Sequence, residues 1–450
     1  MNLKEEMIQI CKSHSALFFV EEFLNDFPNA ELFLVGGAVR DILLKRRTKK
    51  MDFDFVIRLL EKEKIEEWFE SRGKLDFVGK TFGVYKFMPV GHSHADNPFV
   101  DIALPRTEKS SLESCGGYKE FDVQSDAKLP IKKDLSRRDF TINAMAVDMR
   151  TGELHDPFKG IKDIEQRLIR AVGKPSDRFK EDLSRMLRGV RFASELNFEI
   201  EEKTARAIQK QITHINYTKE KLSPEPVEGS KFEYIVPRET IGSELAKTFT
   251  KNPSNALKHL KSTGVLDMFF ETDATLLKPI QSLTENQITL VVTLLLRNLE
   301  QKDIAKKLAL TGLDSLPRES DLRIEPNDIF WLVAQLQKKY DTHSIATMRA
   351  SKFEAMFMNT RGKFFVQLLR TLNEHAEANA IENRKSKILK LWSVEDEEPI
   401  PSLLSGNDVL NAGIQAGPKI RELLDLLRDE QLDGKILTRE KAKEWLTHQS

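Results

Sequence analysis

The segment from Glu31 to Phe55 constrains the fold of this chain more than any other part of its sequence. The apolar run from Leu32 to Val35 predicts a buried strand, which ends at the pair Gly36-Gly37. Ala38 to Leu44 then has the pattern of a helix. A glycine pair at a strand-to-helix turn lets the backbone approach a phosphate closely, and the first turn of a helix offers free N–H groups to an anion.

Gly37 and Arg40 are therefore candidate nucleotide-binding residues, because Arg40 lies one turn into the predicted helix and can add a charge-assisted contact to a phosphate. Downstream, Asp52-Phe53-Asp54-Phe55 alternates with period two, which puts both aspartates on one face of a strand. Magnesium prefers oxygen ligands and shares them with substrate phosphates, so Asp52 and Asp54 are candidate catalytic and metal-binding residues. The alternative is a tight turn followed by an edge strand with solvated aspartates.

Composition sets the class of protein. A chain of 450 residues, 40% hydrophobic, predicts roughly two to four domains with sizeable cores. Basic and acidic residues number 70 each, so a surface for nucleic acid has to be a local patch. Cys11 and Cys115 have no ligand-like spacing, which argues against disulfides or zinc and fits a reducing cytoplasm. The longest apolar runs, such as Ile288–Leu296, are about half a membrane span, and the charged N-terminus does not resemble a signal peptide. We therefore expect a soluble, intracellular protein.

Two further strands are predicted after a charged helix over Glu61–Ser71: one over Asp76–Pro89 and one over Phe99–Leu104. Asp101 lies in the second of these. It either completes the metal site as a third acidic residue or faces solvent at the end of the strand, and the sequence leaves both open. Pro105–Gln124 is polar and predicts a mobile loop of a length that is often functional. The histidines His92 and His94 indicate an exposed turn, because Gly, Asn and Pro surround them.

The segment Asp134–Val147, DLSRRDFTINAMAV, combines two arginines with an aspartate and an asparagine. Arg137 and Arg138 suit phosphates, although a surface basic pair is the alternative for these two alone. Asp139 and Asn143 can hydrogen-bond a ribose, whose 2′-hydroxyl distinguishes ribonucleotides from deoxyribonucleotides.

The segment Thr151–Asp163 is turn-rich and predicts a domain connector. It contains the pair His155-Asp156, which looks metal-like. Pro157 follows, and no second His-Asp pair stands at helical spacing, so a metal phosphohydrolase is not indicated.

The segment Phe179–Phe192 has helical periodicity and carries a stripe of charges. Asp182 and Arg185 are three residues apart and share a face of the predicted helix, and Arg188 and Arg191 continue at the same spacing. A solvated charged face is the usual interpretation of such a run. Three arginines beside one carboxylate also make a strong anion-binding surface.

The remainder, from about Glu199, predicts almost wholly helical structure, with breaks near Thr311–Pro326 and Val394–Ser402. Residues 1–30 predict one or two amphipathic helices as well. Lys221–Lys231, with two prolines and a glycine, indicates an exposed insertion without evident chemistry. The stripe Phe353–Met358 is more typical of a core than of a cofactor site.

These motifs together closely resemble those of class II tRNA nucleotidyltransferases (CCA-adding enzymes) and the related bacterial poly(A) polymerases, over nearly the whole chain. VGGAVRD with Asp52 and Asp54 looks like the metal and triphosphate motif, and RRDFTINAMA (137–146) is close to a family signature. EDLSRMLRGVRF looks like the nucleobase-reading helix, and RETIGSELAK (238–247) looks like part of the body. HDPFKGIKD is similar to the hinge between head and neck, although Lys159 stands where a glycine often does.

The resemblance implies an α+β fold, with a nucleotidyltransferase-type mixed-sheet head followed by an all-helical neck, body and tail. We expect the head over 1–150, the neck with the base-reading helix over 151–215, the body over 216–340 and a tRNA-binding tail over 341–450. It further implies Mg²⁺ as cofactor, no membrane, a cytoplasmic location, a monomer or homodimer, and the tRNA 3′ end as partner. The implied reaction is template-independent addition of the terminal CCA from CTP and ATP, with release of pyrophosphate.

Base choice has a physical explanation in this scheme. A carboxylate only accepts hydrogen bonds and a guanidinium only donates them. Cytosine and adenine each present an amino group beside a ring nitrogen acceptor, so Asp182 and Arg185 can satisfy both bases. Uracil and guanine place a carbonyl oxygen against the carboxylate, and each mismatch should cost about 1–3 kcal/mol.

Other activities remain open at this stage: a poly(A) polymerase, an enzyme that adds only CC or only A, a non-catalytic RNA-binding protein, or a nucleotide-binding regulator. The intact Asp52 and Asp54 disfavour a non-catalytic protein, and the long helical tail disfavours a regulator without RNA. VGKTFGVYKF (78–87), with Thr81 before Phe82, lacks the His-Val ending of bacterial poly(A) polymerases. CC-adding relatives lack the flexible loop that Pro105–Gln124 resembles. We therefore expect complete CCA addition.

Overall fold

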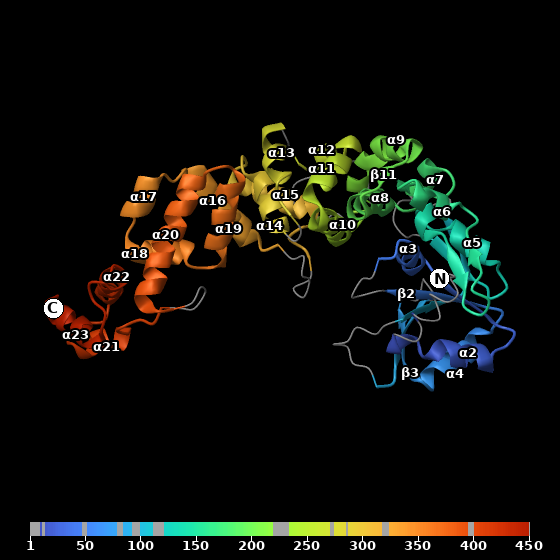
Figure 1. Ribbon diagram of the computed structural model, residues 1–450, viewed down its shortest axis with the longest axis horizontal. Coiled ribbons are helices and arrows are strands. Elements are labelled where there is room, and N and C mark those ends of the chain that lie inside the picture. Colours follow the sequence, from blue (N-terminus) through green and yellow to red (C-terminus); the bar gives the residue numbers. More distant parts are fainter. Residues whose placement is uncertain are drawn as a thin grey trace. The chain divides into compact units, whose positions relative to one another are not determined.

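A computed structural model of the chain describes residues 10, 14–46, 52–78, 84–91, 100–110, 121–218, 234–270, 274–284, 287–316, 324–394 and 400–449. The chain divides into two compact units. Unit 1 comprises Met1–Phe269 and Thr311–Ser315, and unit 2 comprises Phe270–Leu310 and Leu316–Ser450. Unit 1 holds the mixed sheet and unit 2 is helical, so the predicted α+β class is confirmed (Figure 1).

The main sheet is built around the predicted strand that precedes the glycine pair. In the described part of the chain it has seven strands, in the order β3-β4-β5-β2-β1-β8-β9. The pair β2–β5 is parallel and the other neighbours are antiparallel. The strands are β1 (Glu31–Val35), β2 (Phe53–Arg58), β3 (Gly73–Val78), β4 (Val84–Pro89), β5 (Val100–Ala103), β8 (Ala146–Asp148) and β9 (Leu154–His155).

Alternation of side chains along β1 and β2 gives the sheet two different faces. Phe53 and Phe55 enter a core that includes aromatic residues of the helices α2 (Phe19–Asp26) and α4 (Lys62–Glu70). Val56 enters a smaller cluster on the opposite face. Because side chains alternate along a strand, Asp54 shares that opposite face, which confirms its predicted separation from the two phenylalanines; Asp52 precedes the strand.

The other helices of unit 1 cover the sheet or follow it in sequence. They are η1 (Ser15–Leu17), α3 (Gly37–Leu43), α5 (Ile131–Ser136), η3 (Thr141–Asn143), α6 (Gly160–Glu165), α7 (Pro175–Glu181), α8 (Ser184–Leu196), α9 (Glu202–Gln211), η4 (Ile212–Asn216), α10 (Arg238–Lys251), α11 (Pro253–Ser262) and α12 (Val265–Phe269). The short strands β10 (Leu168–Ile169) and β11 (Glu199–Ile200) pair in parallel between them.

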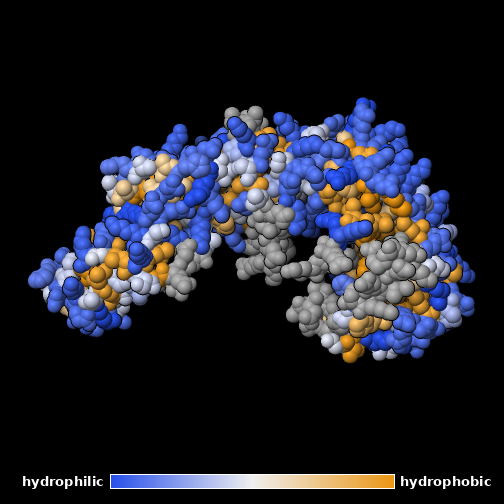
Figure 2. Space-filling model, in the orientation of Figure 1, coloured by the Kyte–Doolittle hydropathy of each residue, from blue (hydrophilic) through white to orange (hydrophobic). Residues whose placement is uncertain are grey.

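Unit 2 consists of amphipathic helices, as the sequence predicts. Phe353 and Phe357 are fully buried, so the Met- and Phe-rich stripe is core. The drawn face of these helices is mainly hydrophilic, with apolar residues between them (Figure 2). The helices are α13 (Ala274–Ile280), α14 (Ile288–Leu296), α15 (Gln301–Thr311, whose last residue belongs to unit 1), α16 (Pro326–Lys338), α17 (Thr342–Thr347), α18 (Ala350–Phe357), α19 (Thr360–Thr371), α20 (His375–Trp392), α21 (Gly406–Asn411), α22 (Pro418–Leu432) and α23 (Arg439–Thr447). Across the described ranges, none of the helices combines the length and apolarity that a membrane span requires.

Three predicted segments differ in detail. The stretch predicted as strand over Asp76–Pro89 is two antiparallel strands, β3 and β4. The ends of the predicted loop Pro105–Gln124 form an antiparallel ribbon of β6 (Arg106–Ser110) and β7 (Phe121–Ser125). The two ends pair with each other across the intervening residues, and such pairing leaves no local signal in the sequence. The polar composition therefore indicated only a loop. The connector Thr151–Asp163 contains β9 and the start of α6. The insertion 221–231, His92, His94 and both cysteines lie outside the described residues.

The connector itself is organised by Asp156. Its two carboxylate oxygens accept hydrogen bonds from the N–H groups of Gly160 and Ile161, at 2.6 and 3.0 Å. Asp156 thus accepts hydrogen bonds from N–H groups of the first turn of α6 that have no partner within the helix. His155 packs edge-on against Phe33. Lys159 adopts a left-handed backbone with φ of 62°, the conformation for which a glycine would carry no steric cost.

Candidate active site

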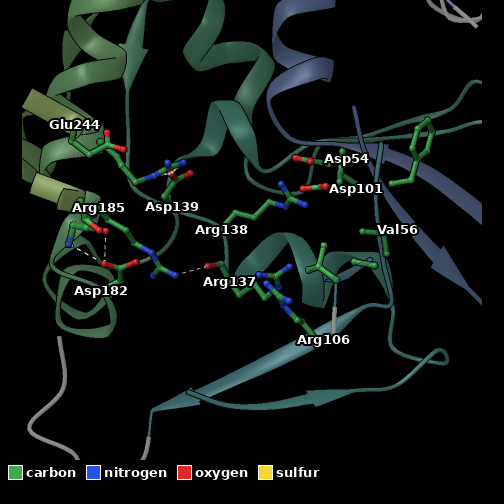
Figure 3. A pocket seen from close by; sticks show the side chains of 17 residues that line it. Asp54, Val56, Asp101, Arg106, Arg137, Arg138, Asp139, Asp182, Arg185 and Glu244 are labelled. Carbon is green, nitrogen blue, oxygen red and sulfur yellow. Dashed lines mark hydrogen bonds and ion pairs between the residues drawn. The ribbon is translucent and has the colours of Figure 1, made fainter. Parts of the chain in front are cut away.

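A cavity of about 390 Å³ lies in unit 1, between the face of the sheet that carries Asp54 and the helices that follow the sheet in sequence. Its walls come from segments far apart in sequence, and Figure 3 shows carboxylates at two ends with arginines between them. The charged or polar lining residues are Asp54, Asp101, Arg106, Arg137, Arg138, Asp139, Asp182, Ser184, Arg185, Arg188, Thr240 and Glu244.

Asp54 and Asp101 form one end of this cavity. They are register partners on the parallel strands β2 and β5, so their carboxylates project from adjacent positions of the same face. Burial, opposed in part by Arg138 and reinforced by the Asp101 and Asp52 carboxylates, raises the pKa of Asp54 to about 6. Burial also raises the pKa of Asp101, against the influence of Lys86. Asp52 is exposed and lies just before β2.

The glycine pair fits closely against this acidic end. Gly36 has φ of +78°, and a Cβ built on it would lie 2.7 Å from a terminal nitrogen of Arg138 and 3.3 Å from Oδ2 of Asp54. Glycine is therefore required here both by the backbone conformation and by the close approach of the two side chains. Gly37 is the first residue of α3 and does not line the cavity.

The acidic end suits a divalent cation by its chemistry. Burial and the neighbouring carboxylates raise the pKa of Asp54, so its charged form would gain from a bound cation, and oxygen donors are what magnesium prefers. The described residues contain no group of three or more His, Cys, Asp or Glu side chains placed to hold a metal by themselves. Magnesium is usually bound through one or two carboxylates together with substrate phosphates and waters, so a small carboxylate set is what such a site needs.

The arginines in the middle of the cavity are held by a residue that the sequence analysis overlooked, Asp134. Its carboxylate is fully buried and accepts from Arg137 at 2.9 Å and from Arg138 at 3.5 Å. Although burial opposes it, the charge of these two arginines lowers the pKa of Asp134. Asp134 precedes Arg137 by three residues and Arg138 by four, and this helical spacing is the signal that could have identified it.

The opposite end of the cavity carries Asp182 and Arg185, and here the predicted helix is wrong. Phe179–Phe192 is not continuous, because α7 ends at Glu181, Asp182 has an extended backbone and α8 begins at Ser184. Oδ1 of Asp182 accepts from the N–H and the hydroxyl of Ser184, at 2.9 and 2.6 Å. Aspartate competes with helical hydrogen bonding in this way, which explains the break. Both residues nevertheless line the same cavity.

Arg185 is fixed by several acceptors. One terminal nitrogen donates to Glu181 at 2.6 Å and to the carbonyl of Arg178 at 3.2 Å. The other donates to the carbonyl of Arg137 at 3.2 Å, which links the start of α8 to the arginine pair. Glu181 is a further residue that sequence reasoning did not single out. Its position four residues before Arg185 is the pattern of a helical ion pair.

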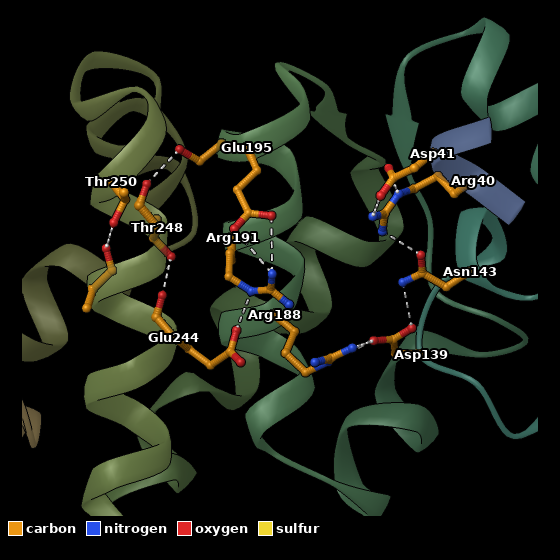
Figure 4. A network of polar contacts seen from close by, with 12 residues as sticks. Arg40, Asp41, Asp139, Asn143, Arg188, Arg191, Glu195, Glu244, Thr248 and Thr250 are labelled. Atoms are coloured by element: carbon orange, nitrogen blue, oxygen red, sulfur yellow. Dashed lines mark hydrogen bonds and ion pairs between the residues drawn. The ribbon is translucent and has the colours of Figure 1, made fainter. Parts of the chain in front are cut away.

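The remaining predicted residues separate into two groups. Asp139 and Arg188 line the cavity and pair through Oδ2 of Asp139, at 2.8 Å from Nε and 2.7 Å from a terminal nitrogen. Burial alone would raise the pKa of Asp139, yet Arg188 and the amide of Asn143 hold that pKa well below its ordinary value. Asn143 and Arg40 lie outside the lining and support Asp139 (Figure 4).

Arg191 also lies outside the lining. Its guanidinium pairs with Glu244 of α10 at 2.7 Å and with Glu195 at 3.2 Å. Glu244 lines the cavity, and neither it nor Thr240 was predicted as a site residue. Arg191 therefore ties α8 to α10, and its predicted contact with nucleotide remains untested.

Comparisons with known proteins agree with this geometry. Residues 32–170 match the family model described as the poly(A) polymerase head domain. The CCA-adding enzyme of Listeria monocytogenes serovar 1/2a is 37% identical over 190 residues, which are 42% of this chain and 43% of that protein. The matched part thus spans less than half the length of this curated relative.

Solved structures extend the likeness along the chain. The Bacillus stearothermophilus CCA-adding enzyme in complex with CTP has a TM-score of 0.69 and 21% identity, covering 97% of this chain and 98% of that one. The Thermotoga maritima CCA-adding enzyme complexed with tRNA has a TM-score of 0.62 and 21% identity, covering 95% and 93%. At these identities the likeness establishes the shared fold.

The sheet, its cavity and the matching head domain define a nucleotidyltransferase-type head joined to a helical remainder. Residues 32–170 match the poly(A) polymerase head-domain family, and the fold of the chain is shared with that of CCA-adding enzymes. A divalent metal is part of the chemistry of this family.

Proposed function

We propose that this chain adds the 3′-terminal CCA to tRNA without a template, using CTP and ATP and releasing pyrophosphate. The observation that carries the proposal is the single cavity that has Asp54 and Asp101 at one end and Asp182 and Arg185 at the other. A nucleotide placed in it would have its phosphates at the acidic end and its base at the other. Structural neighbours of the chain are CCA-adding enzymes in complex with CTP, ATP or tRNA, which is consistent with these substrates.

The reaction joins the 3′-hydroxyl oxygen of the RNA to the α-phosphorus of the nucleotide and breaks the bond to the bridging oxygen, so that pyrophosphate leaves. Asp52 and Asp54 would hold Mg²⁺ together with the substrate phosphates, with Asp101 beside them. When bound there, the ion would neutralise developing charge on the reacting oxygens and favour ionisation of the attacking hydroxyl. Arg137 and Arg138, oriented by Asp134, lie beside this end and suit the phosphates.

Base selection falls to Asp182 and Arg185. Oδ1 of Asp182 is engaged by Ser184, and Arg185 is anchored by Glu181, so both groups are held in place before a base arrives. The carboxylate accepts from the amino group of cytosine or adenine, and the guanidinium donates to the adjacent ring nitrogen. One rigid pair can thus serve both nucleotides and disfavour UTP and GTP.

The remaining assignments belong to the same proposal. We place the head at 1–150, the neck at 151–215, the body at 216–340 and the tRNA-binding tail at 341–450, with a cytoplasmic location. Whether the protein acts as a monomer or a homodimer is left to measurement. The fold is shared along nearly the whole chain with CCA-adding enzymes, and this likeness supports a tRNA-sized substrate rather than a free nucleotide.

The test is extension of a tRNA that lacks its last three nucleotides, with each nucleotide supplied separately together with Mg²⁺. We expect incorporation from CTP and none from UTP or GTP. Activity on generic RNA with ATP alone, producing long adenylate tails, would instead support a poly(A) polymerase. No incorporation from any nucleotide would refute a catalytic role.

A further inference from the structure

A chain of contacts between charged and polar side chains runs from α3 to α8 (Figure 4). Asp41 receives two hydrogen bonds from Arg40, both of 3.0 Å. A third nitrogen of Arg40 donates to Oδ1 of Asn143 at 2.8 Å, and Nδ2 of Asn143 donates to Oδ1 of Asp139 at 3.2 Å. Asp139 ends the chain by pairing with Arg188. Charges alternate along it, so every charged member faces an opposite charge or the amide.

The contacts fix the orientation of the Asn143 amide. Its oxygen faces the guanidinium of Arg40 and its nitrogen faces the carboxylate of Asp139. A flipped amide would set N–H against N–H at one side and oxygen against oxygen at the other. Arg40 is itself held because Asp41 binds its guanidinium at two nitrogens, a geometry that restricts rotation as well as position.

The members of this chain of contacts on the α3 side do not reach the cavity. Arg40 and Asn143 are buried and are absent from its lining, whereas Asp139 and Arg188 line it. The ring of Phe192 on α8 adds a second link, since the guanidinium carbons of Arg40 and Arg188 lie 5.1 and 5.2 Å from its centre. Any influence of Arg40 and Asp41 on a nucleotide therefore passes through the residues that they hold.

The hydrogen-bonding capacity of Asp139 indicates what that influence is. Its carboxylate accepts from the N–H of Phe140, from Asn143 and twice from Arg188, which fills its roughly four acceptor positions. The contact from Asn143 is the longest of these. A ribose 2′-hydroxyl in the cavity could compete for Oδ1 of Asp139, where this longest contact is made, by donating a hydrogen bond to it. A deoxyribose offers nothing in exchange.

We propose that Asp41 and Arg40 are positioning residues for sugar selection: they orient the Asn143 amide, which in turn holds Asp139, the residue of the cavity lining that favours a ribose 2′-hydroxyl. This inference rests on the proposed nucleotidyl transfer. Sugar selection would then be independent of base selection and of metal binding. Neither the Asp182–Arg185 pair nor the Asp54–Asp101 pair belongs to this chain of contacts.

The experiment compares CTP with dCTP as substrates for the full-length protein, as the ratio of their kcat/KM values on tRNA lacking its 3′ end. For Asp41→Asn we expect this ratio to fall on the order of tenfold, with selection of CTP over UTP unchanged. Arg46→Ala is the matched control, because Arg46 also contacts Asp41, at 3.4 Å, but leaves the pair with Arg40 in place. It should keep the wild-type ratio.

A double-mutant cycle separates positioning from a general structural effect. If Asp41 acts through Asn143, then Asp41→Asn should not lower the CTP to dCTP ratio further in an Asn143→Ala background. Additive losses would overturn the inference, as would a wild-type ratio in Asp41→Asn. Should Asp41→Asn not fold, Arg40→Lys gives the same test, because lysine cannot contact Asp41 at two points and Asn143 together. An inactive wild-type protein would refute the proposed function instead.

Discussion

Asp54 of β2 and Asp101 of β5 are direct register partners on two parallel strands, with Asp101 also opposite Lys86 of β4. The sequence leaves the role of Asp101 open, and the structure places its side chain in the lining of the cavity beside Asp54. A contribution of Asp101 to the metal site stays a prediction. Two carboxylates at one level of the sheet, with Asp52 nearby, form the acidic end on which the proposed chemistry depends.

We predict that Asp54→Asn lowers the rate of CMP transfer by about 1000-fold, or about 4 kcal/mol, since it removes a charge that would hold the metal. Asp101→Asn should lower it by at least about tenfold. The measurement is single-turnover extension of tRNA with CTP and saturating Mg²⁺, with tRNA binding measured alongside. Asp76→Asn on β3, whose partner is Lys74, is the control and should keep normal rates. Normal transfer by Asp54→Asn would rule out the assignment.

Asp182→Ala should lose base selection while keeping affinity for the triphosphate. With the carboxylate absent, UTP no longer meets a repulsive oxygen, so its kcat/KM relative to CTP should rise by roughly tenfold or more. Misincorporation of each nucleotide into tRNA measures this directly. Asp177→Ala is a suitable control, because Asp177 is exposed on α7, where it pairs with Lys174 and accepts from the hydroxyl of Ser176. Unchanged selectivity in Asp182→Ala would move base reading to other residues.

Much of the head was predictable because its signals are local. The strand, glycine pair and helix of 31–44 follow from periodicity, and the period of two at 52–55 correctly assigned opposite faces to Asp54 and the phenylalanines. The pairing of Asp54 with Asp101 was not predictable, because strand order and register depend on non-local contacts. The break at Asp182 was missed because a side chain that bonds Ser184 competes with helical periodicity.

Side-chain direction was the other limit. Arg40 was predicted as a phosphate contact from its place in the first turn of α3, whereas the structure directs its guanidinium toward Asp41 and Asn143. Arg191 shares the helical stripe of Arg185 and Arg188 and is engaged by Glu244 of a helix about fifty residues later. Spacing identifies which residues share a face and says little about which of them reach a cavity.

The hinge-like turn at 159–160 offers a test with two neighbouring residues. Lys159→Gly should change the free energy of unfolding by less than about 1 kcal/mol, because relief of its left-handed backbone offsets the greater freedom of glycine in the unfolded chain. Gly160→Ala should destabilise by about 2 kcal/mol or more, since its Cβ would lie 2.4 Å from the carbonyl oxygen of Thr141. Urea unfolding of both variants measures this, and equal effects would contradict the geometry.

The buried pair of Asp139 and Arg188 predicts a pH dependence of stability. Despite burial, Arg188 and Asn143 depress the pKa of Asp139 in the folded protein, so its charge stabilises the fold above the unfolded-state pKa of about 3.9. The loss caused by Asp139→Asn should thus be largest above about pH 5 and should shrink as the pH falls further. Unfolding free energies of both proteins at several pH values between 3 and 7 provide the measurement. A difference that stays constant with pH would contradict the assignment.

Stepwise extension of tRNA ending at its discriminator base tests the central claim most directly. With CTP alone and Mg²⁺ present, we predict that the full-length protein adds two cytidines and stops. With CTP and ATP together, it should add one further adenosine and stop again, so that a single product three nucleotides longer accumulates. Arrest after two cytidines in the presence of ATP, or a long adenylate ladder, would contradict complete CCA addition.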